Sequence, residues 1–524
     1  MPLYREDNYL VVHPGSQNTL FSFGLQDSLS PPQYKIPSRV FQDPVTKAFR
    51  STKEEPKPKA EPAKVEEPKI EEGQAKIEIQ NGQTTAAQNG GSVEAQAPLT
   101  GSEKPWTEIY PIQKGKIVDL DAFNYLLKVI LQSVITKNPI ITINQIPLLI
   151  ISSNLTWSRN TTESVTKYVL ESLEFPAFNL VDLSTAATFG LGISTSSCVV
   201  NIGHENTQIM PVINYQSIKF AGKYLSDVGG KLIDEEISKN LPKLSESQIE
   251  ALKKSGIYEV VLTGDESSFY SISDLQKSNV EDGINGSEDD DDFDVAKLVA
   301  DSGPGNEAQA VTDHDDSKPN NELEKNFFVD PETNEKVWVG KERFQGAENL
   351  ISLVANAIYK SISQIPNLEK RQECFDNLIF VGSTFKIPGF KRALLIRLIT
   401  EYLVRAPTDT KNGGYNKDEE NLSRVNAAIL AYQQTGDSSA DVEESNYISS
   451  QVPTSIKTVK LPDYFPEWKK PKEKGGSWED VYFLGGEIYA KQIFGGNSNH
   501  NGEMFIDNDI YEEKGPSGIW DVTV

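Results

Sequence analysis

The feature that most constrains the fold is a pattern that occurs twice: an apolar strand, a glycine turn and a second apolar strand. It reads YLVVHPGSQNTLFSFG at residues 9–24 and TSSCVVNIGHENTQIMPVIN at residues 195–214. A third segment, residues 377–403, reads as a strand, a Gly-Ser-Thr turn and a helix that begins just after Pro388-Gly389. Two hairpins that face each other can hold the phosphates of a nucleotide with backbone N–H groups. The sequence therefore predicts an α/β protein, with either a nucleotide cleft or ordinary hairpins at these turns.

The segments between these motifs alternate between strand and helix signals. Residues 146–153 are a short apolar run typical of a buried strand, and residues 245–256 indicate a helix with a capping-box-like start and an end at Gly256. Residues 481–494, VYFLGGEIYAKQIF, are interpreted as a strand, a glycine pair and a further element. With 524 residues in all, this alternation predicts more than one lobe.

Three stretches lack these signals. Residues 46–104 are rich in Pro, Glu and Lys and then polar, residues 273–325 contain the acidic run EDDDDFD, and residues 407–450 are polar and acidic. Such segments bury too little apolar surface to offset the loss of chain entropy on folding. We therefore predict that all three are disordered insertions.

The charge of the chain narrows the classes of partner. Lys and Arg number 51 against 76 Asp and Glu, a net charge of −25 that repels nucleic acids and anionic membranes. Any role near DNA is therefore expected to depend on a protein partner or a local basic patch. Cys198 and Cys374 both lie in apolar segments and are expected to be buried thiols in a reducing compartment. The absence of a signal-like start or a long apolar run predicts an intracellular, soluble protein.

The order of the motifs resembles the actin superfamily, nearly from end to end outside the three insertions. The two hairpins resemble the phosphate hairpins of actins, FVGSTFKIPGFKRAL resembles the adenosine-side loop, and YFLGGEIYAKQIF with KGPSGIWDV resembles the closing segments. This implies the two-lobed α/β fold shared by actin, hexokinase and the heat-shock-chaperone ATPases. LPDYFPEWKK, the acidic insertion near residue 290 and the KGPSGIWDV ending are similar to fungal actin-related subunits of the SWI/SNF and RSC chromatin-remodelling complexes.

The resemblance also implies where the lobes begin and end. A large lobe, subdomains 3 and 4, spans residues 191–454 and carries the insertions at 273–325 and 407–450. A low-complexity insertion at 46–104 stands in place of subdomain 2, which disfavours self-filaments. The small lobe comprises residues 1–45, 105–190 and 455–524.

In this alignment the inferred nucleotide cleft is degenerate. The family's metal-binding acids align with His13, Asn201 and His204, its phosphate lysine with Leu20, and its water-orienting glutamine with Ser184. Magnesium prefers carboxylate ligands, and loss of the lysine removes charge complementary to the phosphates. We expect no hydrolysis and no required cofactor, although backbone N–H groups could still bind ATP or ADP weakly. The retained or substituted backbone positions are Gly15, Ser16, Gly203, Gly382, Ser383 and Thr384.

The glycines and histidines also have simpler interpretations. Gly15, Gly203 and Gly382 would be retained if other residues strained the turns. His13 and His204 fall on facing loops and could chelate zinc, but two imidazoles without a nearby Cys or carboxylate make a poor site. We therefore expect no metal site.

The resemblance implies a non-catalytic scaffold subunit of a nuclear ATP-dependent chromatin remodeller that regulates transcription. Its expected partners are a second actin-related subunit and a helical segment before the remodeller's ATPase domain, with the nucleosome contacted indirectly and no membrane. The groove for that helix would be walled by residues 169–190 and by Ile387, Pro388, Ile519 and Trp520, unless these residues simply pack the core. The alternatives are an actin-type ATPase switch that binds nucleotide and an acidic histone-binding module built on residues 273–325.

Overall fold

The computed structural model divides the chain into two compact units. One comprises Met1–Arg39 and Tyr110–Val524, and the other comprises Val40–Ile109. Within the described residues, no helix is long and apolar enough to cross a bilayer. The described residues are 4–25, 29–52, 106–153, 155–193, 196–261, 319–404, 452–462, 465, 468, 477–495 and 504–522.

A six-stranded sheet in the larger unit carries the first predicted hairpin. Its order is β18-β10-β9-β1-β2-β3; β1 pairs antiparallel with β2 and parallel with β9, and β9 pairs parallel with β10. Every residue of β9 and β10 is buried, as is typical of strands covered on both faces. The strand predicted at residues 146–153 is thus confirmed. The strands are β1 (Leu10–Pro14), β2 (Asn18–Phe23), β3 (Tyr34–Pro37), β9 (Leu148–Ser152), β10 (Ala177–Asp182) and β18 (Ile506–Asp507).

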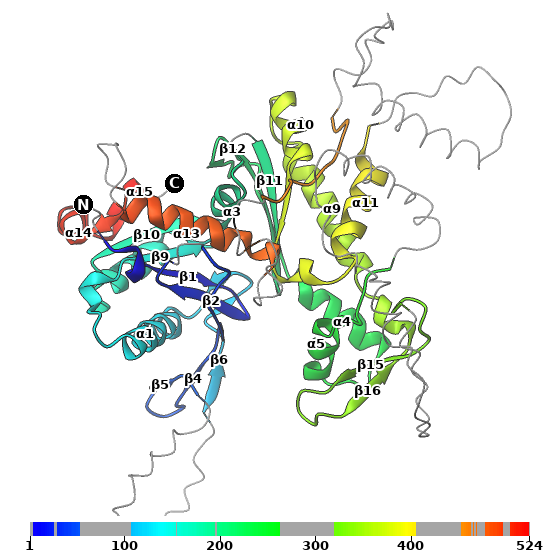
Figure 1. Cartoon of the computed structure of the whole chain (residues 1–524), viewed down its shortest axis with the longest axis horizontal. Helices are drawn as coiled ribbons and strands as arrows, with labels where there is room; N and C mark the ends of the chain where they lie inside the picture. Colours follow the sequence, from blue (N-terminus) through cyan, green and yellow to red (C-terminus); the bar gives the residue numbers. More distant parts are fainter. Residues whose placement is uncertain are drawn as a thin grey trace, which may run out of the picture. The chain divides into compact units, whose positions relative to one another are not determined.

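The segment predicted to begin with a strand at residue 481 is a helix, so that prediction is wrong. This helix, α13 (Val481–Phe494), packs against α3 (Leu183–Leu191) and against β1 and β9 (Figure 1). The glycine pair serves close packing and not a turn, because a Cβ on Gly485 would overlap the carbonyl oxygen of Ala186. Most of α13 is buried, so its sequence lacks the one-sided apolar period that identifies a surface helix.

A second sheet carries the other two motifs. Its order is β13-β12-β11-β17, with β14 also paired to β12. The antiparallel pair β11–β12 is the second hairpin, and β17 runs parallel to β11 with Asn201 opposite Val381. The predicted strand, turn and helix of residues 377–403 are confirmed as β17, the 3-10 turn η6 (Ser383–Lys386) and α11 (Phe390–Tyr402). The strands are β11 (Ser196–Ile202), β12 (Asn206–Ile213), β13 (Gln216–Ser217), β14 (Lys223–Ser226) and β17 (Leu378–Val381).

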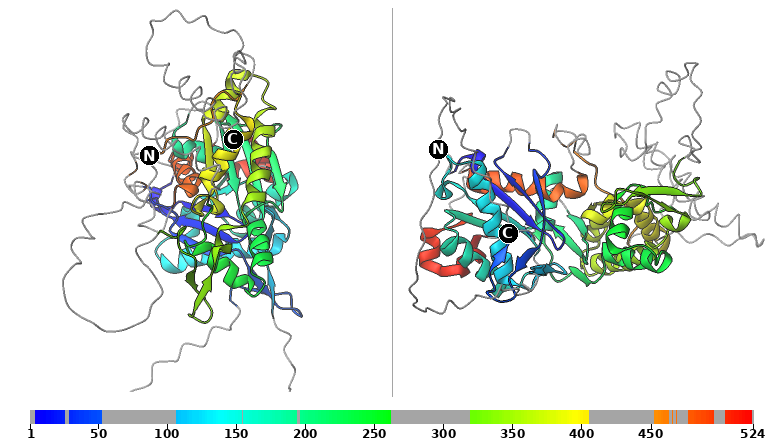
Figure 2. Two further views of the ribbon diagram at one scale, coloured as in Figure 1. Left: turned by 90° about the vertical axis from the view of Figure 1, so that its right-hand side faces the viewer. Right: turned by 90° about the horizontal axis from the view of Figure 1, so that it is seen from below.

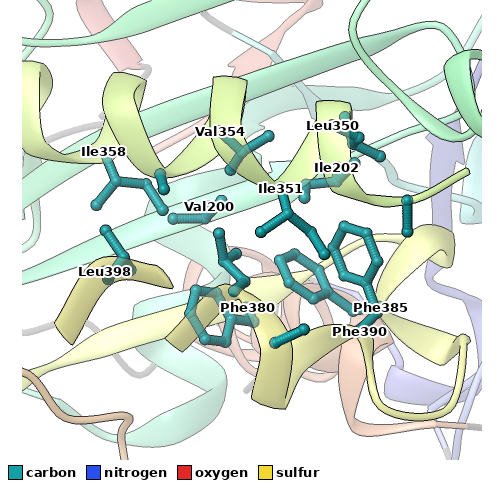
Figure 3. Packing of buried hydrophobic residues seen from close by; sticks show 14 of the residues in the cluster. Val200, Ile202, Leu350, Ile351, Val354, Ile358, Phe380, Phe385, Phe390 and Leu398 are labelled. Carbon is teal, nitrogen blue, oxygen red and sulfur yellow. The ribbon is translucent and has the colours of Figure 1, made fainter. Parts of the chain in front are cut away.

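Helices pack on this second sheet around one large apolar cluster. Figure 3 shows α9 (Glu348–Ile362) laying Leu350, Ile351, Val354 and Ile358 toward β11 and β17. α11 closes the cluster with Phe390 and Leu398, and η6 contributes Phe385. A second apolar cluster joins α13 and α3 to strands of both sheets. These two cores hold the strands from which both glycine turns project.

The start and the end of α5 (Glu246–Lys254) follow local signals. Ser245 Oγ accepts from the Gln248 N–H, and the Gln248 side chain accepts from the Ser245 N–H at 3.0 Å. The helix stops just before Gly256, whose φ is +80°, so the predicted cap and end are confirmed. The other helices are α1 (Leu120–Lys137), α2 (Arg159–Lys167), α4 (Gly230–Asn240), α10 (Leu368–Asp376), α14 (Asn508–Lys514) and α15 (Ile519–Val522).

Short elements complete the larger unit, which Figure 2 shows from two further directions. Two hairpins stand apart from the main sheets, β7 (Ile112–Gln113) with β8 (Lys116–Ile117) and β15 (Asn326–Val329) with β16 (Lys336–Val339). The single turns are η1 (Glu6–Asn8), η2 (Ile143–Gln145), η3 (Tyr168–Ser172), η5 (Lys341–Phe344), η10 (Trp478–Asp480) and η11 (Gly515–Gly518).

The smaller unit contains a three-stranded sheet of order β5-β4-β6. Its strands are β4 (Val40–Gln42), β5 (Phe49–Arg50) and β6 (Thr107–Ile109), and the Arg50 guanidinium lies 3.8 Å from the centre of the Trp106 ring. β5 lies within the predicted insertion at 46–104, so the prediction of disorder is wrong for residues 46–52; residues 53–104 lie outside the described residues.

The other predicted insertions fall mostly outside the described residues. Residues 319–325 are described and lead into β15, whereas 273–318 and 407–450 are not described. The predicted lobe boundaries stay a prediction, since the division into compact units falls elsewhere in the chain. Cys198 and Cys374 are both buried free thiols, which confirms that they are buried, and the reducing compartment stays a prediction.

Candidate functional site

The first glycine turn, residues 14–17, closes the β1–β2 hairpin. The Gly15 N–H donates to the Asn18 carbonyl at 3.1 Å, and a Cβ on Gly15 would lie 2.6 Å from that oxygen. Glycine is therefore required here by steric contact. The side chains beyond it face other elements: Ser16 Oγ accepts from the Gly115 N–H at 3.4 Å, and Gln17 Nε2 donates to Glu250 Oε1 at 3.0 Å.

His13, just before this turn, is partly buried and packs against neighbouring elements. Its Nδ1 lies 3.0 Å from the Ile151 carbonyl oxygen and therefore carries the proton that it donates. Its ring meets Tyr482 edge to face, with ring centres 4.7 Å apart. Burial lowers the pKa of His13, against smaller opposing effects of the Ile151 carbonyl and Asp480. Leu20, at the position of the family's lysine, packs against the cluster beneath α13. This hairpin thus has a neutral imidazole at the position aligned with the family's acid, and an apolar side chain at the position aligned with its lysine.

The second glycine turn, residues 203–206, meets the start of α4 and the Gly382 loop. The Gly203 carbonyl accepts from the Gly230 N–H at 2.9 Å and from Thr384 Oγ1 at 3.1 Å. Gly382 has a φ of +105°, and a Cβ there would overlap the Ile202 carbonyl and lie 2.7 Å from Asn201 Oδ1. Thr384 is buried and Ser383 is exposed. The structure therefore brings together the predicted residues of the second hairpin and of the adenosine-side loop.

Gly203 is less restricted than the other two glycines. A Cβ there would lie 3.3 Å from the Asn206 carbonyl oxygen, a close contact that small shifts relieve. The interpretation that shape alone retains the three glycines therefore fits Gly15 and Gly382 better than Gly203.

The β7–β8 turn links the two glycine turns. Its Lys114 N–H donates to Glu205 Oε2 of the second turn at 2.7 Å, and its Gly115 N–H donates to Ser16 Oγ of the first. Two backbone N–H groups of the β7–β8 turn thus donate to one side chain from each glycine turn.

Ser184 lies at the start of α3, and its hydrogen bonds run to other strands. Its N–H donates to Asp182 Oδ2 at 3.1 Å, its hydroxyl also contacts this carboxylate, and its Oγ lies 3.1 Å from Ser217 Oγ. These partners belong to β10 and β13. A role for Ser184 in the cleft stays a prediction.

A charged cluster beside the second turn was not predicted from the sequence. Lys253 Nζ lies 2.6 and 2.7 Å from the two carboxylate oxygens of Asp234 and 3.0 Å from Glu250 Oε2. Glu250 also accepts from Lys254 at 2.7 Å and, as described above, from Gln17 of the first turn. The i,i+3 spacing of Glu250 and Lys253 on α5 was a usable signal, but the sequence does not indicate that Asp234 on α4 joins them.

Burial and neighbouring charges shift the pKa values of the cluster's groups in different directions. Burial raises the pKa of Asp234 to about 6, although Lys253 opposes this shift. Burial acts in the same direction on Glu250, but Lys253, Lys254 and Gln17 together lower its pKa to about 2. Burial and then Lys253 lower the pKa of His204, so its ring is neutral at pH 7. The carboxylates of Asp234 and Glu250, next to the second turn, would repel an anionic phosphate. The Lys253 ammonium, which could attract a phosphate, is already paired with both of them.

The four predicted groove residues divide between interior and surface. Ile387 lies in the large apolar cluster and Ile519 is fully buried, as the core-packing interpretation expects. Pro388 is exposed, with its carbonyl accepting from the Val260 N–H at 3.0 Å. Trp520 is half-buried and donates from Nε1 to Glu163 Oε1 at 2.9 Å. A shared partner groove stays a prediction.

Comparison with known proteins agrees with this geometry. The family model described as Actin matches residues 6–411, and the chain therefore belongs to the actin family. Its fold is the predicted actin-like α/β fold. The chain is also 25% identical, over 554 residues and 99% of each sequence, to the Schizosaccharomyces pombe protein named "SWI/SNF and RSC complexes subunit arp9". The resemblance to fungal actin-related protein 9 of these complexes is thus confirmed.

Proposed function

We propose that this chain is a non-catalytic, actin-related scaffold subunit of a nuclear ATP-dependent chromatin-remodelling complex. The similarity to a SWI/SNF and RSC subunit along the whole chain supports the class of complex. The non-catalytic part of this proposal rests on the contacts of the His13 ring. This ring is packed on Tyr482 and its proton is committed to the Ile151 carbonyl, at a position where the family has an acid.

The remaining groups around the turns also argue against metal-assisted hydrolysis. Magnesium-bound nucleotide needs hard oxygen ligands for the metal and a cation for the terminal phosphates. Leu20 supplies no charge, and the amide of Asn201 is neutral. Glu205 of the second turn accepts from the Lys114 N–H. Weak binding of ATP or ADP through backbone groups remains compatible with this proposal.

As a scaffold, the chain would bind a second actin-related subunit and a helical segment that precedes the remodeller's ATPase domain, in support of transcription regulation. Trp520 offers a half-buried aromatic surface of the kind enriched at interfaces, with Arg159 5.6 Å from its ring centre. Pro388 is a second exposed position for such a contact.

A binding assay with the full chain, the second actin-related subunit and the helical pre-ATPase peptide tests this function. We expect a stable ternary complex without added nucleotide, and Trp520→Ala to weaken it about tenfold or more, the effect of losing one aromatic anchor. Trp338→Ala is the matched control, because Trp338 is an exposed tryptophan, 50% accessible, on the separate β15–β16 hairpin. Assembly that requires ATP and its hydrolysis would instead support the ATPase switch.

The acidic run EDDDDFD supports histone binding as a second candidate function. It lies outside the described residues. Deletion of residues 273–318 separates the two functions: lost histone binding with intact complex assembly favours the histone-binding module, and unchanged histone binding excludes it.

A further inference from the structure

Three side chains able to bind a metal ion converge from three elements of the larger unit. His204 comes from the β11–β12 turn, Asp234 from α4 and Glu250 from α5, and one ligand atom from each lies within 4.8 Å of the others. All three residues are partly buried. The pairing of His204 with His13 considered from the sequence lacked carboxylates, whereas this set contains two.

The centre of this cluster already attracts a cation. The Lys253 ammonium contacts both carboxylates, and the Gly230 carbonyl oxygen lies 3.4 Å from Nζ. The Lys254 ammonium also pairs with Glu250 at 2.7 Å, but its side chain is 58% exposed, and ion pairs at such exposed positions contribute little. Among the described residues, moreover, no hydrogen bond engages the His204 ring, so a nitrogen lone pair is available beside the carboxylates.

The donor set selects a class of ion. One imidazole nitrogen and two carboxylate oxygens suit zinc and similar borderline ions, which take three protein ligands and a water. Magnesium and calcium prefer oxygen alone. A divalent ion also interacts more strongly with two carboxylates than an ammonium does, and it gains a bond to His204 that the ammonium does not make here.

We propose that His204, Asp234 and Glu250 form a site for a divalent ion of the zinc class, which binds by displacing the Lys253 ammonium. The site is independent of the proposed scaffold function. Because Glu250 also accepts from Gln17, an ion there would hold the β11–β12 turn, α4 and α5 together next to the first glycine turn.

Titration of the chelator-treated full chain with CoCl2, followed by displacement with ZnCl2, tests this site. We expect one cobalt ion per chain with visible absorption typical of a four- or five-coordinate site, and zinc to displace it. His204→Ala should weaken binding about tenfold or more, since it removes one of three ligands. Lys253→Met should strengthen binding, because it removes the competing cation.

Two controls separate the site from unspecific binding. Glu246→Gln changes an exposed acid on the same helix and should leave affinity unchanged. The metal-free His204→Ala variant should unfold at the same denaturant concentration as the natural chain, within about 1 kcal/mol of stability. Absence of stoichiometric binding to the natural chain, or equal affinity in His204→Ala, would overturn the proposal.

Discussion

The two glycine turns have the same plan, but their histidines have different surroundings. His13 is partly buried, donates to the Ile151 carbonyl and packs on Tyr482. His204 lies beside Asp234 and Glu250, with no hydrogen bond to its ring among the described residues. The same residue type, two residues before the glycine of the first turn and one residue after the glycine of the second, is a packed structural group in the first and lies beside two carboxylates in the second. The comparison teaches that the neighbouring elements decide what a histidine does at each of the two turns.

Replacing each histidine with alanine should separate these two roles most clearly. His13→Ala removes a part-buried hydrogen bond and an aromatic contact, and we expect a loss of about 2–4 kcal/mol in the free energy of unfolding. His204→Ala should change it by less than about 1 kcal/mol. Denaturant unfolding at pH 7.5 measures both variants, and equal losses would contradict the distinction.

An alanine should destabilise the chain more at the glycine of the first turn than at the glycine of the second, as for the histidines. Gly15→Ala places a Cβ 2.6 Å from the Asn18 carbonyl oxygen, whereas Gly203→Ala meets the Asn206 carbonyl at 3.3 Å. We expect Gly15→Ala to destabilise the chain by about 1–3 kcal/mol and Gly203→Ala by less than about 1 kcal/mol. Thermal unfolding of the two variants side by side checks the order, and a larger loss for Gly203→Ala would reverse it.

The partly buried ring of His13 predicts a dependence of stability on pH. Its pKa is lowered from 6.5 in the folded chain, so protonation favours the unfolded chain. This contribution is fully present above pH 6.5 and is lost as the pH falls below it, at up to about 1.4 kcal/mol per pH unit. The stability difference between the natural chain and His13→Gln should therefore be constant from pH 7 to 8 and shrink toward pH 5. A constant difference over the whole range would show that the ring is not held neutral.

The smallest effect concerns the contact between the first turn and α5. Gln17→Ala removes one hydrogen bond to Glu250, and we expect a loss of about 0.5–1.5 kcal/mol. Lys47→Ala, at an exposed position of the smaller unit, serves as the surface control. Hydrogen exchange should show faster opening of residues 14–18 in Gln17→Ala; unchanged exchange would mean that Gln17 does not stabilise this turn.

Much of the fold could be predicted because its signals are local. The two hairpins, the segment of residues 377–403 and both ends of α5 follow from short patterns of glycine, capping residues and apolar runs. The helix α13 could not be predicted in this way. Because α13 is buried on nearly all sides, its sequence lacks the helical periodicity of apolar residues. Its glycine pair also resembles the sequence of a turn.

The candidate site was less predictable because it depends on contacts between distant segments. The family resemblance aligns His13 and His204 with acids, but Ile151 and Tyr482, which contact His13, are 138 and 469 positions further along the chain. Likewise, Asp234 and Lys253 meet only through the packing of α4 against α5. Residue type and spacing therefore located the turns and did not reveal what each side chain does.

The central claim is that the chain does not hydrolyse ATP. Its most direct test is to measure equilibrium binding and turnover of ATP on the purified full chain, with and without magnesium and with its partner subunit bound. We expect no phosphate release, and any binding of ATP to be as weak with magnesium as with EDTA. Tighter binding of ATP with magnesium, together with steady phosphate release, would contradict the claim. The groups around His13 and His204 would then support hydrolysis of ATP.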